Sequence, residues 1–241
     1  MALIITIMAG GEGKRMRSSI PKVLHLFRGK PMLVRIIEVA RAAFPSKIVV
    51  ITGKFHKQIV QTVAQYIDSF GIVFVEQPEP MGTGHAIQCS LGQYSRDDRI
   101  LILNGDMPLL TLSVIENFIQ FVWHDEFAVM TTRLPNPQGY GRIVMQGDEF
   151  TGIVEEKDCT EEQRQISVVN AGIYFSRGYI LCDYIPKITN NNGQKEYYLT
   201  DMVSILRGRS IAVGTFLLRE KENICLRGVN TPEELQELEK E

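Results

Sequence analysis

The sequence predicts an α/β fold, a doubly wound and mostly parallel sheet with an antiparallel hairpin elaboration in the second half of the chain. Two observations support this prediction. First, short runs of apolar and β-branched residues alternate with amphipathic stretches of helical length. The runs are apolar throughout, as in parallel strands that helices cover on both faces. Second, the regular alternation of strand-like and helical segments ends at about Phe127, and two strand-like segments then flank the turn-rich spacer QGDE.

The first half of the chain supplies the parallel strands and the helices between them. The expected strands are residues 3–8, 47–53, 71–77 and 99–106, and the expected helices are residues 30–44, 55–67, 83–93 and 112–123. Pro31 suits the first turn of the first helix, because the N–H groups there have no acceptor within the helix and a proline, which lacks the N–H, breaks no hydrogen bond. Two neighbouring parallel strands need a connection of a dozen or more residues between them, usually a helix. The segments between the expected strands are long enough for this, in agreement with a parallel sheet.

The second half combines the hairpin with further strands and helices. Its strands are expected at residues 141–145, 150–158, 168–175 and 211–218, and its helices at residues 196–206 and 231–241. The last helix has the clearest start signal, with Thr231 as the cap and Glu234 three residues later. No internal repeat or low-complexity linker divides the chain, so a single domain over residues 1–241 is the simplest prediction, with halves at 1–126 and 127–241.

The composition argues against several classes of protein. The 241 residues are 44% hydrophobic and 22% charged, and the net charge of −2 gives no general attraction to nucleic acid or anionic lipid. The four cysteines lie far apart without a C-x-x-C pair, which argues against a zinc site or a disulfide framework. Neither an apolar run of about 18 residues nor a secretion signal is visible, so we expect a cytoplasmic protein with no nucleic-acid or membrane partner.

A glycine-rich loop follows the first expected strand, in the stretch MAGGEGKRMRSSIPKVLH. A Walker A loop needs Ser or Thr after Gly-Lys, and a dinucleotide fingerprint needs a third glycine near Met16, so the loop is neither. Glycines let a backbone approach an anion closely, and Arg15 and Lys22 suit phosphate oxygens. Because ligands of parallel sheets lie outside the carboxyl ends of the strands, we predict a phosphate site here. A glycine-rich turn with solvated basic residues is the alternative.

A second signal is the motif NGDMP at the end of the expected strand 99–106. An Asp just past a buried parallel strand lies in the same crevice as the glycine-rich loop. Asp106 could hold Mg²⁺, which takes one or two carboxylates together with substrate phosphates, or it could be a turn residue before Pro108. Together, the glycines, the cations and the isolated Asp favour phosphoryl or nucleotidyl transfer without a protein nucleophile.

A series of motifs along the chain resembles one known family. GGEGKRM with PKVLH, EQPEPMGTGHA, LNGDMPLL, NPQGYGRIV, GIVEEKD with VVNAGIYF, EYYLTDM and RGVN are similar to motifs of bacterial N-acetylglucosamine-1-phosphate uridyltransferases. The resemblance covers residues 3–238 and implies a Rossmann-like nucleotidyltransferase domain. Residues 1–126 would then be its nucleotide-binding half and residues 127–241 its sugar-binding half. The implied reaction is Mg²⁺-dependent transfer of the uridylyl group of UTP to N-acetylglucosamine-1-phosphate, which gives UDP-N-acetylglucosamine and pyrophosphate.

The resemblance also implies roles for individual residues. Arg15 and Lys22 would hold the triphosphate and, with Asp106, carry catalysis. Asp106 and Asn230 would bind Mg²⁺ through oxygen atoms, as a hard cation requires. The amide of Gln77 would read the uracil, because an amide can pair with an imide edge. The residues expected to hold the nucleotide are Ala9, Gly10, Gly11, Gly13, Gln77, Gly82 and Thr83, and those expected to contact the sugar are Gly141, Glu155 and Asn170.

The implied reaction needs little acid–base assistance. A sugar phosphate has a second pKa of about 6, so it is mostly a dianion at neutral pH and can attack the α-phosphorus directly. We therefore expect His85 to be structural rather than a general base. Tyr197 and Tyr198 could stack on a sugar, but packing is expected for at least one of them. Glu156 and Lys157 are expected at a solvated strand edge, although Lys157 could lie near the product phosphate.

The chain departs from the family pattern at a few positions. Gly10 stands where Ala is usual, Lys14 where Thr or Ser is usual, and Ala171 where Thr is usual. Lys14 would add charge near the phosphates or point outward, and Ala171 could change the sugar contacts. The family's bacterial members continue into a C-terminal β-helix acetyltransferase domain, whereas this chain stops at Glu241. We therefore expect no acetyltransferase activity, and a monomer or dimer.

Two alternatives to this function remain open from the sequence. The first is a nucleotidyltransferase for another sugar-1-phosphate or for dTTP, since small changes in a pocket redirect such enzymes and Gln77 favours uracil without excluding thymine. The second is a non-catalytic nucleotide-binding protein. Such a protein would be expected to have lost Lys22, Asp106 or Asn230, and all three are present.

Overall fold

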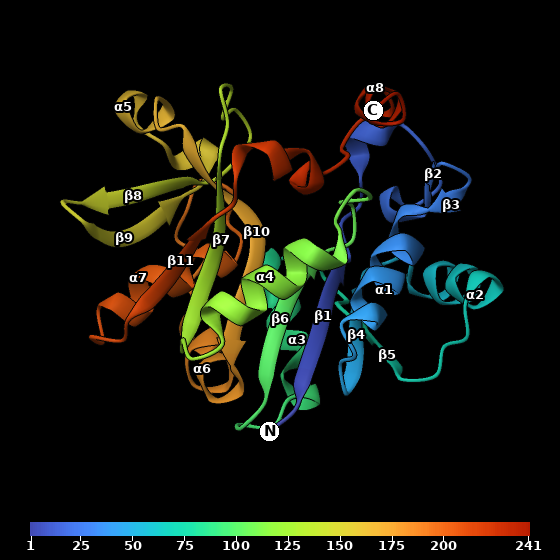
Figure 1. Ribbon diagram of the computed structural model, residues 1–241, viewed down its shortest axis with the longest axis horizontal. Helices are drawn as coiled ribbons and strands as arrows, with labels where there is room; N and C mark the ends of the chain where they lie inside the picture. Colours follow the sequence, from blue (N-terminus) through green and yellow to red (C-terminus); the bar gives the residue numbers. More distant parts are fainter.

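The computed structural model describes residues 1–241 and has a nine-stranded sheet at its centre, with helices on both faces (Figure 1). The strand order is β11-β7-β10-β6-β1-β4-β5, and β8 joins the sheet through β10. Its parallel part consists of β1 (Leu3–Ala9), β4 (Lys47–Thr52), β5 (Ile72–Glu76) and β6 (Arg99–Asn104). These strands correspond to the four that the apolar runs predicted.

The second half of the chain adds the antiparallel part of the sheet. β10 (Val168–Arg177) pairs antiparallel with β6 and with β7 (Phe127–Arg133), and β11 (Val213–Leu217) lies parallel to β7. β8 (Arg142–Gln146) and β9 (Glu149–Val154) form the hairpin expected around QGDE. The predicted fold class is therefore confirmed. β2 (Leu26–Phe27) and β3 (Lys30–Pro31) form a separate small sheet.

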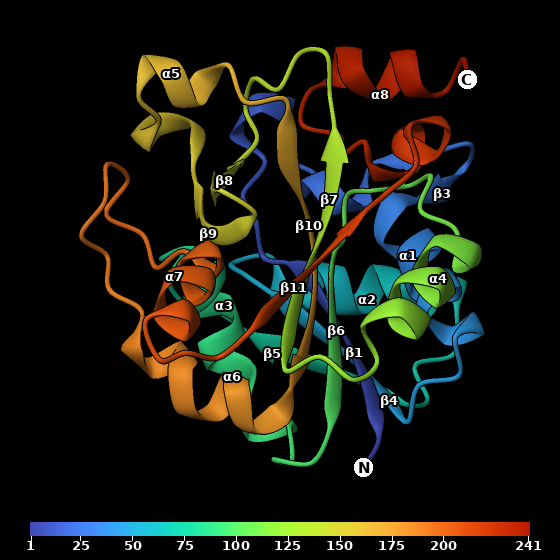
Figure 2. The ribbon, with the colours of Figure 1, turned by 60° about the vertical axis from the view of Figure 1, so that its left-hand side comes forward.

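Helices cover the two faces of the sheet in two groups, as the turned view shows (Figure 2). The α-helices are α1 (Met32–Ala42), α2 (His56–Tyr66), α3 (Thr83–Ser90), α4 (Leu112–Val122), α5 (Glu161–Arg164), α6 (Gly178–Tyr184), α7 (Met202–Arg207) and α8 (Pro232–Leu238). One buried cluster contains α1, α2 and α4, and a second contains α3, α6 and α7. Because neighbouring residues of a strand face opposite ways, Ile5 belongs to the first cluster and Ile4 to the second. None of these helices combines the length and apolarity needed to cross a membrane.

Short 3₁₀ helices connect many of these elements. They are η1 (Lys14–Met16), η2 (Lys22–Leu24), η3 (Leu91–Gln93), η4 (Glu156–Asp158), η5 (Ile185–Lys187), η6 (Leu199–Asp201) and η7 (Glu220–Leu226). The predicted cap of the last helix is present, since Thr231 Oγ1 accepts from the Glu234 N–H at 3.1 Å.

The structure corrects two boundaries of the elements expected from the sequence and adds one strand. The strand expected over residues 150–158 ends at Val154, because the chain turns there and the Asp158 N–H bonds to the Glu155 carbonyl at 2.9 Å. The helix expected over 196–206 begins only at Leu199, as η6, and continues as α7. β7 was not among the expected strands, although its residues are almost all buried.

Candidate active site

Two adjoining cavities, of about 490 and 520 Å³, open at the carboxyl ends of β1 and β6. The first, here called the loop cavity, is lined by all the residues expected to hold the nucleotide: Ala9, Gly10, Gly11, Gly13, Gln77, Gly82 and Thr83. The second, the hairpin cavity, is lined by all those expected to contact the sugar: Gly141, Glu155 and Asn170. Arg15, Asp106 and Asn230 line both cavities, so the two spaces share a wall.

The glycine-rich loop holds its shape through one close approach. Gly13 has a φ of 61°, and a Cβ atom there would lie 2.6 Å from the Cβ atom of Lys22, so only glycine fits. Met16 is buried and packs with Val229 and Leu238. This contact fixes the loop against the C-terminal segment that carries Asn230, although the two are far apart in sequence.

A cation already lies between the two residues expected to bind metal. The Lys22 ammonium forms an ion pair with Asp106 Oδ2 and donates to Asn230 Oδ1 at 3.1 Å. A backbone hydrogen bond holds the segments of Asp106 and Asn230 together, since the Val229 N–H donates to the Asp106 carbonyl at 3.0 Å. One carboxylate and one amide oxygen are hard ligands, and with phosphate oxygens and water they suit Mg²⁺. No cluster of three or more His, Cys, Asp or Glu side chains accompanies them.

The far end of the loop cavity is built around the Gln77 amide. Its Nε2 donates to the Gly82 carbonyl at 3.0 Å. Gly82 has a φ of 104°, and a Cβ atom there would lie 2.6 Å from the Tyr197 carbonyl oxygen. The next residue is also fixed, because Thr83 Oγ1 accepts from the Leu199 N–H at 3.0 Å. The turn at residues 82–83 therefore packs tightly against the segment before η6.

Polar groups also converge in the hairpin cavity. Glu155 accepts from the Thr200 hydroxyl at 2.9 Å, and burial raises the pKa of its carboxyl above the ordinary value. Asn170 is buried in β10, where its Nδ2 donates to the Tyr174 hydroxyl at 2.6 Å and its Oδ1 accepts from the Gly172 N–H at 2.9 Å. The Asn170 N–H donates to the Gly141 carbonyl at 2.9 Å, which joins two of the expected sugar contacts.

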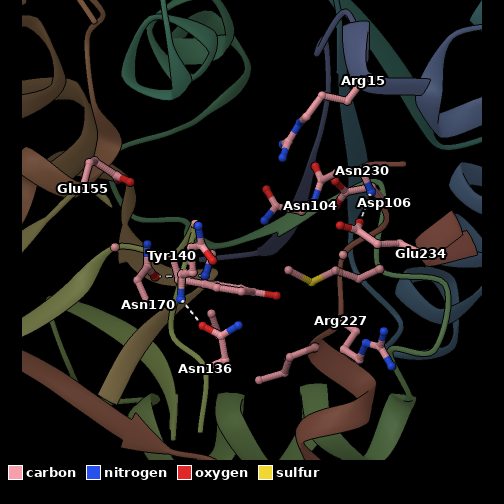
Figure 3. A pocket seen from close by; sticks show the side chains of 18 residues that line it. Arg15, Asn104, Asp106, Asn136, Tyr140, Glu155, Asn170, Arg227, Asn230 and Glu234 are labelled. Atoms are coloured by element: carbon pink, nitrogen blue, oxygen red, sulfur yellow. Dashed lines mark hydrogen bonds between the residues drawn. The ribbon is translucent and has the colours of Figure 1, made fainter. Parts of the chain in front are cut away.

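Figure 3 shows how these groups face one another across the hairpin cavity. Glu155 lies on one side, and Asp106 and Asn230 lie on the other, with Tyr140 projecting between them. Several further lining residues are not among those expected from the sequence, among them Asn104, Tyr140, Arg227 and Glu234. The first three belong to the motifs LNGDMPLL, NPQGYGRIV and RGVN, so their motif membership was the available signal. For Glu234 the sequence indicates only a helix start, yet its carboxylate accepts from the Asn230 N–H at 2.6 Å.

One expectation beside the site was wrong. Glu156 is not simply a solvated strand edge, because it accepts from the buried Arg142 guanidinium at 2.7 Å and from the Gly139 N–H at 2.9 Å. It therefore fixes the loop that leads to Gly141. Lys157 is exposed and lines neither cavity.

Tyr198 and the three residues that depart from the family pattern, Gly10, Lys14 and Ala171, lie in or near the cavity walls. Tyr198 is buried and lines neither cavity, in agreement with a packing role. Lys14 lies at the rim of the loop cavity, and its highly exposed side chain forms an ion pair with Glu12 at 3.0 Å. Ala171 is buried in the wall of the hairpin cavity. Gly10 packs closely on its surroundings, since a Cβ atom there would lie 3.1 Å from Gln77 Oε1 and 3.3 Å from the Thr52 carbonyl carbon.

Comparison with known proteins places this site among nucleotidyltransferases. Residues 5–146 match the model of the MobA-like NTP transferase domain. The chain is 42% identical over 242 residues to a probable UDP-N-acetylglucosamine pyrophosphorylase of Acanthamoeba polyphaga mimivirus, an alignment that covers 98% of this chain and 95% of that protein. It is 38% identical to the bifunctional protein GlmU of Francisella philomiragia subsp. philomiragia over 100% of this chain and 52% of the relative. The chain thus spans about half the length of that relative.

Solved structures show the same fold at lower sequence identity. A UDP-glucose pyrophosphorylase complexed with UDP-glucose has a TM-score of 0.76 and 17% identity, covering 100% of this chain and 98% of that chain. A putative glucose-1-phosphate thymidylyltransferase from Bacillus anthracis has a TM-score of 0.74 and 19% identity, covering 99% and 94% of the two chains. These structures agree with the Rossmann-like fold, and the sequence relatives confirm the family resemblance that the motifs indicated.

Proposed function

The chain belongs to the MobA-like NTP transferase domain family and is a nucleotidyltransferase, and we propose that it transfers the uridylyl group of UTP to N-acetylglucosamine-1-phosphate. The observation that carries this proposal is that Asp106 and Asn230 lie on the wall shared by two cavities and both bind the Lys22 ammonium, which lines the loop cavity. The name of the mimiviral relative supports the same substrates. Membership of a transferase family also favours an enzyme over a non-catalytic nucleotide-binding protein.

The two cavities suit the two substrates of this reaction. UTP would occupy the loop cavity, with its base at Gln77 and its triphosphate along the glycine-rich loop. The sugar would occupy the hairpin cavity, where Glu155 accepts from a hydroxyl and Asn170 contacts the N-acetyl region. This arrangement brings the sugar phosphate and the α-phosphate together at the shared wall. Residues 1–126 would thus bind mainly the nucleotide and residues 127–241 mainly the sugar, within one domain.

In the reaction itself the phosphate oxygen of the sugar attacks the α-phosphorus of UTP. A new P–O bond forms, the bond from the α-phosphorus to the bridging oxygen breaks, and pyrophosphate leaves with that electron pair. The protein must align two anions and offset their repulsion, and Arg15 lines both cavities at the position where this is needed. Lys22 supplies the second cationic side chain.

We further propose that Asp106 and Asn230 hold Mg²⁺ during this reaction. Their oxygen atoms are the ligands that Mg²⁺ prefers, and they converge on a position that a cationic group occupies in the structure. When bound, the ion would neutralise the charge that develops on pyrophosphate. Lys22 would then turn from these two side chains toward the phosphates.

Pyrophosphate release across a small substrate matrix tests the proposed function. UTP, dTTP and CTP would each be paired with N-acetylglucosamine-1-phosphate, glucosamine-1-phosphate and glucose-1-phosphate in the presence of Mg²⁺. We expect UTP with the N-acetylated sugar to give the highest kcat/KM. Turnover with a different pair would keep the mechanism and replace the proposed specificity, whereas absence of turnover in every combination would contradict the proposal.

The sugar assignment predicts a selective effect of Asn170→Ala. Truncation removes the amide contact to the sugar and leaves the Gly172 N–H without its acceptor. We expect the KM for the sugar phosphate to rise about tenfold or more, with a much smaller change in the KM for UTP. Steady-state kinetics with each substrate varied in turn would measure both values. Asn170→Asp is the matched variant, because it keeps the acceptor for Gly172, and equal rises in the two KM values would remove Asn170 from the sugar site.

A further inference from the structure

The Gln77 side chain is held by two residues, and only one of them is among those expected from the sequence. Besides the Gly82 carbonyl, its Nε2 also contacts His85 Nδ1 at 3.0 Å. Both bonds join positions close in the chain, on either side of the turn that starts α3. His85, which the sequence predicts to be structural rather than a general base, contacts the amide that faces the base end of the loop cavity.

Simple hydrogen-bond chemistry fixes the orientation of this amide. The Gly82 carbonyl can only accept, so the amide atom 3.0 Å away from it must be the nitrogen. The second hydrogen of that nitrogen then points to His85, whose Nδ1 must accept. His85 is therefore a neutral imidazole with its proton on Nε2, and that N–H faces Cys89 Sγ at 3.7 Å.

The consequence concerns the other end of the amide. With both Nε2 hydrogens engaged, Gln77 offers the cavity only its carbonyl oxygen. This oxygen has no hydrogen-bond partner within the chain and lies beside Gly10, where a Cβ atom would come within 3.1 Å of it. The residue thus acts as an acceptor only, although a free amide could also donate.

We propose that His85 is a positioning residue that holds Gln77 as an acceptor and so selects bases with an N–H at ring position 3. Uracil and thymine have this N–H, whereas cytosine has a lone pair there. A fixed acceptor facing a lone pair is repelled and leaves both groups unpaired, which is the strongest basis for rejecting an analogue. The proposal rests on the proposed function, because it assumes that a pyrimidine base occupies the loop cavity.

Two variants separate the hydrogen bond from the packing of the ring. His85 also packs beside Tyr197, with ring centroids 6.3 Å apart, so a change could act through shape alone. His85→Phe keeps a ring and removes the acceptor. His85→Asn removes the ring and keeps an acceptor at nearly the position of Nδ1. Gln88→Ala is the control, since Gln88 is exposed on the same helix and lines neither cavity.

The measurement is the ratio of kcat/KM for UTP to that for CTP, together with calorimetric affinities for UDP and CDP. We expect His85→Phe to lower the UTP:CTP ratio about tenfold, mainly through the UTP KM, since one orienting hydrogen bond is worth about that much. His85→Asn should retain most of the preference, and Gln88→Ala all of it. The UTP:dTTP ratio should stay unchanged in every variant, because both bases carry the same N–H.

Each other outcome would overturn the inference. If His85→Phe kept the preference for UTP over CTP and His85→Asn lost it, His85 would act through the packing of its ring and not through the hydrogen bond. If His85→Phe does not fold, His85→Asn decides alone, because loss of its preference contradicts the hydrogen-bond role. Failure of the proposed function itself would be visible earlier, as a wild-type protein that binds neither UDP nor CDP or does not distinguish them.

Discussion

Replacing Asp106 with alanine will lower kcat by about 10³-fold or more, while the KM for the sugar phosphate changes little. Asp106 lies on the wall between the two cavities and is the only carboxylate that lines both of them near Lys22 and Asn230. In the proposed reaction, its loss removes the charged ligand for Mg²⁺, and the charge on the departing pyrophosphate is then poorly compensated. Glu155 and Asn170, which are proposed to contact the sugar, lie across the hairpin cavity from Asp106, so sugar binding should survive (Figure 3).

Initial rates of pyrophosphate release at saturating Mg²⁺ would measure this effect, and electron paramagnetic resonance of bound Mn²⁺ would measure the loss of the ion directly. Asp97→Ala is a suitable control, since Asp97 is exposed at the opposite end of β6. The unfolding temperature of Asp106→Ala should fall, because the Asp106 and Lys22 side chains are only 16% and 15% exposed and the variant leaves the ammonium without its partner. A near-normal rate in Asp106→Ala would remove this residue from the metal site.

The positions of the central site residues could be predicted because they depend on sheet topology. The glycine-rich loop follows β1 and Asp106 follows β6, and the register pairs Met8 with Asn104. The carboxyl ends of neighbouring parallel strands must meet, so an apolar run followed by polar residues is enough to bring these groups together. Asn230 could be placed beside Asp106 only by resemblance, because its approach depends on the packing of Met16 against Val229.

The sequence could not show contacts that depend on the exact path of irregular segments. Glu156 looked solvated because its neighbours in sequence are charged, yet it meets Arg142 and the Gly139 backbone across the hairpin. His85 is eight residues from Gln77, and their contact depends on the glycine conformation at Gly82. Propensities and periodicity describe regular elements, and neither contact lies within a single one.

Replacing Lys22 with methionine should have two opposite effects, on turnover and on metal affinity. Turnover should fall by about 10²- to 10³-fold, because a cation that offsets the repulsion of two anions is lost. In the absence of nucleotide, however, the Lys22 ammonium holds both Asp106 and Asn230, so it competes with a divalent ion for the same oxygens. Methionine has a similar length and no charge, so Mn²⁺ should bind more tightly to the nucleotide-free variant than to the wild type.

Titration of nucleotide-free protein with Mn²⁺, followed by electron paramagnetic resonance, separates this competition from catalysis. Lys30→Met is the matched control, because Lys30 pairs with Glu38 and lines neither cavity, and its Mn²⁺ affinity should equal that of the wild type. Adding a nucleoside triphosphate should reduce the difference between Lys22→Met and wild type, since the phosphates would draw the ammonium away from Asp106. If Lys22→Met bound Mn²⁺ no more tightly than the wild type, Lys22 would not compete with the ion, and its ion pair with Asp106 would coexist with bound metal.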